Sequence, residues 1–222
     1  MKLALFDLDG TLLPIDSDHA FGEFLIALGW ADGAAYRRRN DDFYEQYKAE
    51  RLDIAAYVDF CTAPWRNRCA AELAAAQQRF VDQVARPALR DSALALVQRH
   101  REAGDRLAVV TATNDFITRP IAALFGIETL IATELARDAD GRVTGAIHGT
   151  PAFRDGKVGR VNDWLAAEGC TWSDYEAQVF YSDSINDLPL LERVSHPVAT
   201  NPGPTLEALA LQRRWPILRL FP

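Results

Sequence analysis

An apolar run that ends in two acidic residues, Leu3 to Phe6 followed by Asp7 and Asp9, places the strongest constraint on this chain. Consecutive apolar residues are typical of a strand that is buried on both faces of a parallel sheet. Residues two apart in an extended chain project to the same side. Asp7 and Asp9 are therefore expected to share one small volume beyond the strand, where open α/β sheets bind ligands. Gly10 allows the sharp turn that follows.

Two carboxylates at this separation repel one another unless a cation or a proton lies between them. The pattern by itself is also compatible with a polar turn after a strand, so its meaning depends on what the rest of the chain adds. A calcium-binding loop is excluded, because such a loop needs a third oxygen ligand before a glycine at its sixth position. Counted from Asp7, Gly10 comes fourth.

The composition is that of an ordinary globular protein, with 49% hydrophobic and 25% charged residues among 222. A formal net charge of −7 argues against a nucleic-acid partner or an anionic membrane surface. Three cysteines without Cys-x-x-Cys spacing indicate neither a disulfide framework nor a zinc site. The chain enters its first strand without a basic leader, and no apolar run approaches 18 residues. We expect a cytoplasmic protein without stable membrane association.

The periodicity of apolar residues divides the chain into two parts. Residues 15–86 show helical spacing without a strand signal, whereas helical and extended patterns alternate from residue 87 onward. The alternation predicts a doubly wound parallel sheet. We therefore expect an α/β, Rossmann-like core from residues 1–14 and 87–222, with an all-helical domain, residues 15–86, inserted into it. Pro87 is expected to begin the first helix of the second core segment, because proline is favoured in the first helical turn.

Further strands of the core are indicated by short apolar runs between the helical patterns. The alternating stretches on either side of Asp140-Gly141 also predict a β-hairpin. The expected core strands span 107–110, 129–132, 177–181 and 194–199.

Polar residues follow three of these strands: Asp7 with Asp9, then Thr111, then Asp183. Lys157 begins a helix between the last two. Parallel strands present their carboxyl ends at one edge of a sheet, so these side chains can converge although they are far apart in the sequence. Each also has a simpler role open to it: Thr111 as a helix cap, Lys157 as a solvated helix residue, and the acids as loop residues.

Together, these residue types suit phosphoryl transfer. Asp7 would attack phosphorus and form an aspartyl-phosphate. Asp9 could protonate the leaving alcohol and then deprotonate the water that hydrolyses the intermediate. Asp7 and Asp183 would hold Mg²⁺, which needs oxygen ligands. Thr111 and Lys157 would bind the phosphoryl oxygens, and the ammonium would offset the clustered carboxylates.

In these residues the chain resembles the haloacid dehalogenase-like (HAD) phosphohydrolases over essentially its whole length. The resemblance implies a nucleophile at Asp7, an acid/base at Asp9 that also gives Mg²⁺ its backbone carbonyl, and a metal ligand at Asp183. Ala112 and Asn186 are further predicted substrate contacts within these motifs. The helical insert is similar to the C1-type cap of the phosphoserine phosphatase-like branch, subfamily IB. The four motifs are Asp7-Leu-Asp9-Gly-Thr11, Thr111, Lys157 and Asp183-Ser-Ile-Asn186-Asp187.

Departures from that branch concern the substrate. Phosphoserine phosphatases typically carry Ser-Gly-Gly where this chain has Thr111-Ala112-Thr113. Their glutamate for the substrate amine is replaced here by Asp16, which could still face an amine. Ser17-Asp18-His19 is more similar to a bacterial group that includes histidinol-phosphate phosphatases.

The sequence therefore predicts a Mg²⁺-dependent phosphomonoesterase for a small phosphorylated metabolite, similar to phosphoserine or histidinol phosphate. A phosphatidylglycerophosphate-type lipid phosphatase, a phosphoacceptor domain and a non-catalytic domain are the alternatives. Arg37–Arg39, Arg66 and Arg68 could hold a second substrate anion, although a solvated helix face is the more common role. Phe21 and Phe24 are expected in the core of the insert.

Overall fold

A computed structural model describes residues 1–221, and within them six parallel strands form one sheet. The strands are β1 (Leu3–Phe6), β2 (Arg106–Asn114), β3 (Thr129–Thr133), β6 (Gln178–Ser182), β7 (His196–Thr200) and β8 (Ile217–Leu218). Their order across the sheet is β3-β2-β1-β6-β7-β8, with every neighbouring pair parallel. The chain moves outward from β1 to β3 and returns on the other side of β1 at β6. The predicted doubly wound sheet is confirmed, and the strand order reverses between β1 and β6, where such sheets bind ligands.

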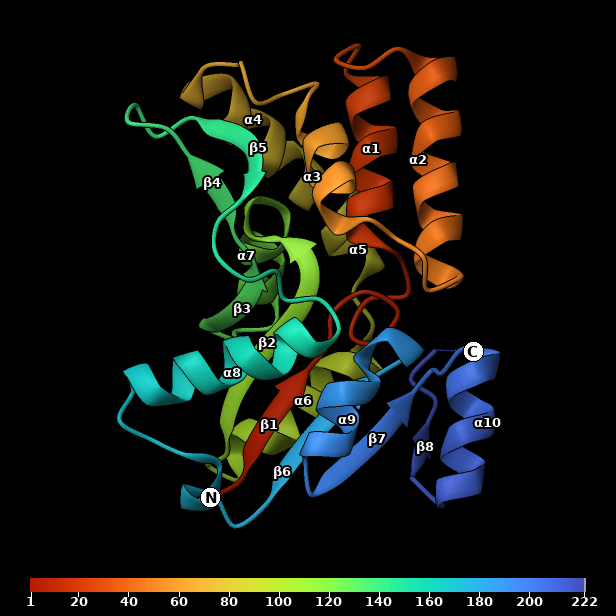
Figure 1. Ribbon diagram of the computed structural model, residues 1–222, viewed down its shortest axis with the longest axis vertical. Helices are drawn as coiled ribbons and strands as arrows, with labels where there is room; N and C mark the ends of the chain where they lie inside the picture. Colours follow the sequence, from red (N-terminus) through yellow and green to blue (C-terminus); the bar gives the residue numbers. More distant parts are fainter. Residues whose placement is uncertain (222) are drawn as a thin grey trace.

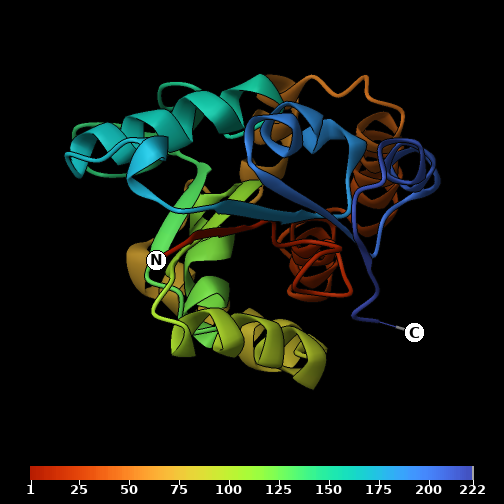
Figure 2. The same ribbon diagram turned by 90° about the horizontal axis from the view of Figure 1, so that it is seen from below.

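Helices cover both faces of the sheet (Figure 2). They are α6 (Asp91–Glu102), α7 (Asp115–Leu124), α8 (Asp155–Ala167), α9 (Leu188–Arg193) and α10 (Pro204–Arg213). The side chains of β1 point alternately to the two faces of the sheet. Ala4 and Phe6 belong to the apolar cluster that includes α6 and α7, while Leu3 and Leu5 belong to the cluster of α8, α9 and α10. This double burial explains why the first strand is apolar at every position.

The helical insert stands beyond the carboxyl ends of the strands, between β1 and β2 (Figure 1). It contains α1 (Ser17–Ala27), α2 (Gly33–Lys48), α3 (Ile54–Thr62) and α4 (Ala70–Phe80). As predicted, no strand interrupts it within the described residues. The predicted hairpin is also confirmed: antiparallel β4 (Leu135–Arg137) and β5 (Val143–Ile147) lie outside the main sheet, and β5 packs against α3. Among residues 1–221 no helix has both the length and the apolar character that a membrane crossing needs.

The expectation that Pro87 begins a helix is wrong. Helix α4 continues through a π-helical turn, Val81–Ala85, into the short α5 (Arg86–Ala88), and Pro87 lies inside α5. The next helix begins at Asp91. Proline has no N–H for a regular α-helical bond, and the wider π-helical turn directly before α5 carries the chain through that position. The division into domains at residues 86 and 87 stays a prediction.

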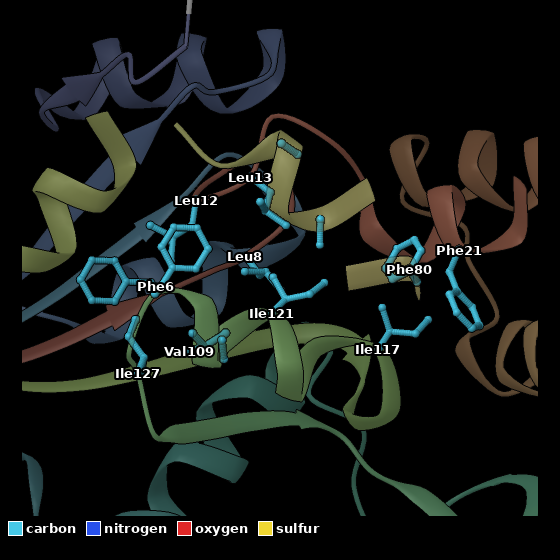
Figure 3. Close-up of a cluster of buried hydrophobic side chains, with 14 of the residues drawn as sticks. Phe6, Leu8, Leu12, Leu13, Phe21, Phe80, Val109, Ile117, Ile121 and Ile127 are labelled. Carbon is cyan, nitrogen blue, oxygen red and sulfur yellow. The ribbon is translucent and has the colours of Figure 1, made fainter. Parts of the chain in front are cut away.

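One hydrophobic cluster joins the insert to the sheet. Figure 3 shows Phe6 and Val109 of the sheet in the same cluster as Phe21 and Phe80 of the insert. The ring of Trp65 also stacks on Phe116 of α7, with ring centroids 4.5 Å apart. The prediction that Phe21 and Phe24 are core residues is confirmed, since both are buried in this cluster. The insert is therefore anchored to the core by apolar packing on its α7 side.

Candidate active site

A cavity of about 420 Å³ lies between the carboxyl ends of the strands and the helical insert. This volume is in the range that small-molecule sites occupy. Lys157 is not part of the cavity wall. The predicted site residues that line the cavity are Asp7, Asp9, Asp16, Thr111, Ala112, Asp183 and Asn186.

Lys157 lies buried behind Asp7 and binds two carboxylates. Its Nζ is 2.8 Å from Asp7 Oδ1 and 2.7 Å from a carboxylate oxygen of Asp187. Asp187 is held in turn by the Ser182 hydroxyl at 2.7 Å. Burial lowers the pKa of Lys157, but the charges of Asp187 and Asp7 outweigh burial, so the pKa lies above its usual value. The ammonium group therefore stays charged and fixes the orientation of Asp7.

Asp183 is drawn toward Asp7 by the residues of the first motif. The Thr11 hydroxyl lies 3.3 Å from Asp7 Oδ2 and 3.2 Å from Asp183 Oδ1, and it accepts the Asp183 N–H at 3.0 Å. Gly10 has φ +72°, and a Cβ atom there would stand 2.3 Å from Asp183 Oδ2. The glycine is thus needed both for the turn and for the close approach of the second carboxylate.

Asp9 occupies a separate environment on the same turn. Its Oδ1 accepts the Ser17 N–H and its Oδ2 accepts the Thr113 hydroxyl, both at 2.9 Å. Burial and then the charge of Asp16 raise the pKa of Asp9 to about 8, although its bonds to Ser17 lower it. A carboxyl group with this pKa can carry a proton near neutral pH, as a general acid must.

Negative charge exceeds positive charge at the sheet edge, because Asp7, Asp183 and Asp187 surround a single ammonium group. Burial raises the pKa of Asp7 to about 6, and burial together with the charge of Asp7 raises the pKa of Asp183 well above its usual value. Residues 1–221 contain no group of three or more His, Cys, Asp or Glu side chains arranged to hold a metal. The proposed ligands are the side chains of Asp7 and Asp183 and the main-chain carbonyl of Asp9, which is fewer than three such side chains. All three are oxygen ligands of the kind that Mg²⁺ prefers. The donor set and the uncompensated charge therefore fit this ion.

Two of the predicted substrate contacts have partners within the protein. Asp16 caps α1, and its Oδ1 accepts the His19 N–H at 2.8 Å. Asn186 donates from Nδ2 to the Tyr47 carbonyl at 3.1 Å and accepts Arg154 Nε at 3.2 Å on Oδ1. Asn186 thus links the insert to the core at the cavity wall.

The arginines of the insert do not line the cavity. Arg37 pairs with Glu23 at 2.7 Å, and Arg68 lies over the Trp30 ring, 3.9 Å from its centroid. Arg66 pairs with Asp59. Arg37, Arg66 and Arg68 are thus engaged by groups of the insert itself, and a contact of these arginines with a substrate anion stays a prediction.

Sequence reasoning missed the aromatic wall of the cavity. Phe43, Tyr44, Tyr47 and Tyr57 line it from the insert side. Helical periodicity places such residues on a packing face, but it does not tell whether that face meets a hydrophobic core or a cavity. The same limit applies to Asp18, which also lines this side.

Comparison with known proteins agrees with this geometry. A family model described as haloacid dehalogenase-like hydrolase matches residues 4–192. The chain is 44% identical over 217 residues to a histidinol-phosphatase of Neisseria meningitidis serogroup C (strain 8013), covering 98% of each chain. It is 32% identical over 220 residues to phosphoserine phosphatase SerB1 of Mycobacterium tuberculosis (strain ATCC 25618 / H37Rv), covering 96% of this chain and 69% of that one.

Solved structures support the fold. A crystal structure of a protein with unknown function from Bordetella pertussis Tohama I has a TM-score of 0.93 at 48% identity, covering 99% of both chains. A substrate-bound phosphoserine phosphatase has a TM-score of 0.67 at 17% identity, covering 98% of this chain and 92% of that one.

Proposed function

Since this chain belongs to the haloacid dehalogenase-like hydrolase family, we propose that it hydrolyses a small phosphate monoester through an aspartyl-phosphate on Asp7. The chain is a phosphatase, as its relatives are. Histidinol phosphate is the first candidate substrate and phosphoserine the second, because the nearly full-length relative at 44% identity is a histidinol-phosphatase. Mg²⁺ is the proposed cofactor.

The proposed reaction has two displacements at phosphorus. Asp7 attacks the phosphorus atom while the ester P–O bond breaks, and Asp9 donates its proton to the departing alkoxide oxygen. Asp9 then removes a proton from a water molecule, whose oxygen attacks phosphorus and releases the Asp7 carboxylate. Lys157 keeps Asp7 oriented throughout, and Thr111 faces the phosphoryl group from β2. Mg²⁺ held by Asp7, Asp183 and the Asp9 carbonyl would neutralise charge on the transferring group.

One observation carries the proposal: side chains from distant segments meet at one cavity and form a single charge system. Asp7, Thr111 and Asp183 come from β1, β2 and the end of β6, and buried Lys157 comes from α8. A set of unrelated loop acids would not bring a buried lysine within 2.8 Å of the first aspartate. Charged groups buried and paired in this way are typical of catalytic sites.

The alternatives are less compatible with the cavity. The cavity of about 420 Å³, with several acids in its wall, has the volume of a site for a small molecule and is too small to hold a whole diacyl lipid. A stable phosphoacceptor has no need of Asp9, which in the proposed reaction activates a water molecule for dephosphorylation. The cytoplasmic location and the lack of a nucleic-acid partner stay predictions.

A phosphate-release screen tests the proposal. Histidinol phosphate, phosphoserine, a sugar phosphate and phosphatidylglycerophosphate are each assayed with Mg²⁺ and with a chelator. We expect the highest kcat/KM for histidinol phosphate, loss of activity with the chelator and recovery when Mg²⁺ is added back. Asp183→Asn should weaken Mg²⁺ binding, measured by calorimetry. Phosphate release that persists without divalent ions, or no release from any ester, would contradict the proposal.

A further inference from the structure

Asp18 is a buried acid that the proposed reaction does not use. It lies in the first turn of α1, lines the cavity, and is 7% exposed. Within residues 1–221 its Oδ1 has no hydrogen-bond partner. A carboxylate that is buried without a partner destabilises a fold, so such a group at a cavity wall indicates a ligand that completes its bonds.

The groups around Asp18 do not neutralise it. Burial raises the pKa of Asp18 well above its usual value, and the negative charges of Asp16 and Asp9 raise it further, while the Tyr57 hydroxyl lowers it. Its other titratable neighbours, Tyr36 and Cys61, are also uncharged or acidic groups.

The two basic side chains of the cavity wall are bound elsewhere. His19 Nε2 is 2.8 Å from Asp41 Oδ1, and Lys48 Nζ is 2.6 Å from Glu45 Oε1. The described lining contains no arginine. This part of the cavity therefore offers an acid without a counter-charge, and it offers no unpaired cation to a substrate carboxylate.

Aromatic rings complete the same part of the cavity. The Tyr57 hydroxyl lies beside Asp18, and the Tyr57 ring meets Phe43 with centroids 5.3 Å apart. The face of an aromatic ring attracts a cation. Cations of the protein already show this preference: Lys48 Nζ lies 4.7 Å from the centroid of the Tyr44 ring, and Arg39 Cζ lies over one face of the Phe43 ring, 4.4 Å from its centroid. A carboxylate beside aromatic rings is the chemistry that recognises a positively charged nitrogen.

We propose that Asp18 and the neighbouring rings of Tyr57 and Phe43 form a subsite for a positively charged nitrogen on the leaving group of the substrate. This inference rests on the proposed phosphatase function. The substrate class is then an amino- or imidazole-bearing alkyl phosphate without a carboxylate. Asp16, whose Oδ1 accepts the His19 N–H at the start of α1, stays a predicted substrate contact beside this subsite. Phosphoserine fits less well, since its carboxylate would meet acids and no free cation.

Steady-state kinetics of Asp18→Asn test the proposal with two substrates. Histidinol phosphate carries a cationic leaving group, whereas p-nitrophenyl phosphate has none. We expect kcat/KM for histidinol phosphate to fall about 10- to 100-fold, mainly through KM, as for loss of one charge-assisted hydrogen bond. The value for p-nitrophenyl phosphate should stay within about twofold. Asp42→Asn, the same substitution at an exposed position of α2, is the matched control and should change neither.

Equal losses on both substrates, or no loss on histidinol phosphate, would overturn the subsite. If the wild-type protein hydrolyses only p-nitrophenyl phosphate, the subsite fails and the phosphatase function stands. If it hydrolyses neither, the phosphatase function fails. Binding of histidinol, measured by calorimetry without turnover, then decides the subsite separately: binding by wild type that Asp18→Asn loses supports it, and equal binding or none refutes it.

Discussion

At the scale of single residues, the site is organised by the unequal number of acids and bases at the sheet edge. Lys157 is shared by Asp7 and Asp187, so only part of the charge on Asp7 is offset. The Thr11 hydroxyl contacts the carboxylates of both Asp7 and Asp183 and holds them close together. One substitution can therefore remove the nucleophile, Asp7, and another can displace the second carboxylate, Asp183. Each of these two changes gives a separate prediction.

Asp7→Asn should abolish turnover, because a carboxamide is a poor nucleophile and cannot form the aspartyl-phosphate. Enzymes accelerate monoester hydrolysis by up to about 10²¹-fold, so loss of the nucleophile should leave no measurable rate. The substitution keeps the shape of the side chain, and the melting temperature should show a folded protein. Asp42→Asn is the control for the removal of one negative charge. Mg²⁺-dependent phosphate release well above background by Asp7→Asn would refute the role of Asp7.

Gly10→Ala should reduce kcat and Mg²⁺ affinity beyond what its loss of stability explains. A methyl group at position 10 would stand 2.3 Å from Asp183 Oδ2, and φ is +72°. Gly104→Ala is the matched control, because φ is +71° there and nothing lies within 4 Å of the added Cβ. Each variant should lose about 1–2 kcal/mol of unfolding free energy from the left-handed backbone. We expect only Gly10→Ala to lose kcat and Mg²⁺ affinity, and equal activity of the two variants would contradict the geometry.

At the scale of elements, the helical insert meets the core by polar contacts at the end of α2. The carbonyls of Tyr47 and Glu50, in and just after the last turn, accept bonds from Asn186 and Arg154. The Tyr47 hydroxyl also bonds Ser184 at 3.2 Å. The last carbonyls of a helix lack partners within the helix, and here groups of the core supply some of them. These bonds close the cavity on the side away from the apolar anchor.

Arg154 offers a test of this closure. Its φ is 52° and its ψ is −125°, a region that glycine adopts at little cost. Arg154→Ala and Arg154→Gly both lose the bonds to Asn186 and Glu50, so both should raise KM and speed amide hydrogen exchange near residues 47–51. Arg154→Gly should be more stable than Arg154→Ala by about 1–3 kcal/mol in denaturant unfolding, because the strain is relieved. Equal stability would show that the backbone is not strained, and unchanged exchange would show that these bonds do not hold α2.

The sequence predicted elements well where a local pattern decides them, and less well where distant contacts do. Buried apolar runs located β1 and β6, and Asp140-Gly141 located the hairpin. The two-residue strand β8 was missed, because it pairs only through β7 and has no pattern of its own. Pro87 was assigned to a helix start by its usual preference, which the preceding π-helical turn overrides.

The site shows the same division. Residues that follow strands, such as Asp7 and Asp183, could be predicted because the topology of a parallel sheet brings strand ends together. Asp18 and the rings around it could not, because their position depends on how the insert is oriented over the sheet. Contacts of this kind arise from tertiary packing, which helical periodicity does not encode.

At the scale of the whole molecule, the insert is attached to the core by two unlike surfaces. Apolar packing of Phe21, Phe80 and Trp65 joins it to the α7 side, and polar bonds join α2 to the core loops across the cavity. Polar bonds at a cavity exchange readily with water, whereas buried aromatic packing does not. Opening for substrate entry is therefore expected on the α2 side, with the α7 side as the pivot.

The shared hydrophobic cluster predicts that insert and core unfold together. Phe80 of α4 is 1% exposed, and its ring contacts Phe21 edge-on at 5.0 Å between centroids. Phe80→Ala should cost about 3–5 kcal/mol of unfolding free energy through lost burial and the remaining cavity. Leu211→Ala, at a position that is 65% exposed, is the control and should change stability by less than about 0.5 kcal/mol.

Denaturant unfolding of Phe80→Ala, followed by far-ultraviolet circular dichroism and by tryptophan fluorescence, checks this prediction. Trp30 and Trp65 lie in the insert, and Trp164, Trp172 and Trp215 lie in the core. Variants that keep only the first group or only the second report on one region each. Because the insert buries its apolar face against the sheet and not within itself alone, neither part should stay folded without the other. All probes should give one coincident transition, displaced to lower denaturant concentration. Two resolved transitions, with the insert melting first and the sheet unaffected, would show that the cluster in Figure 3 does not couple the two parts.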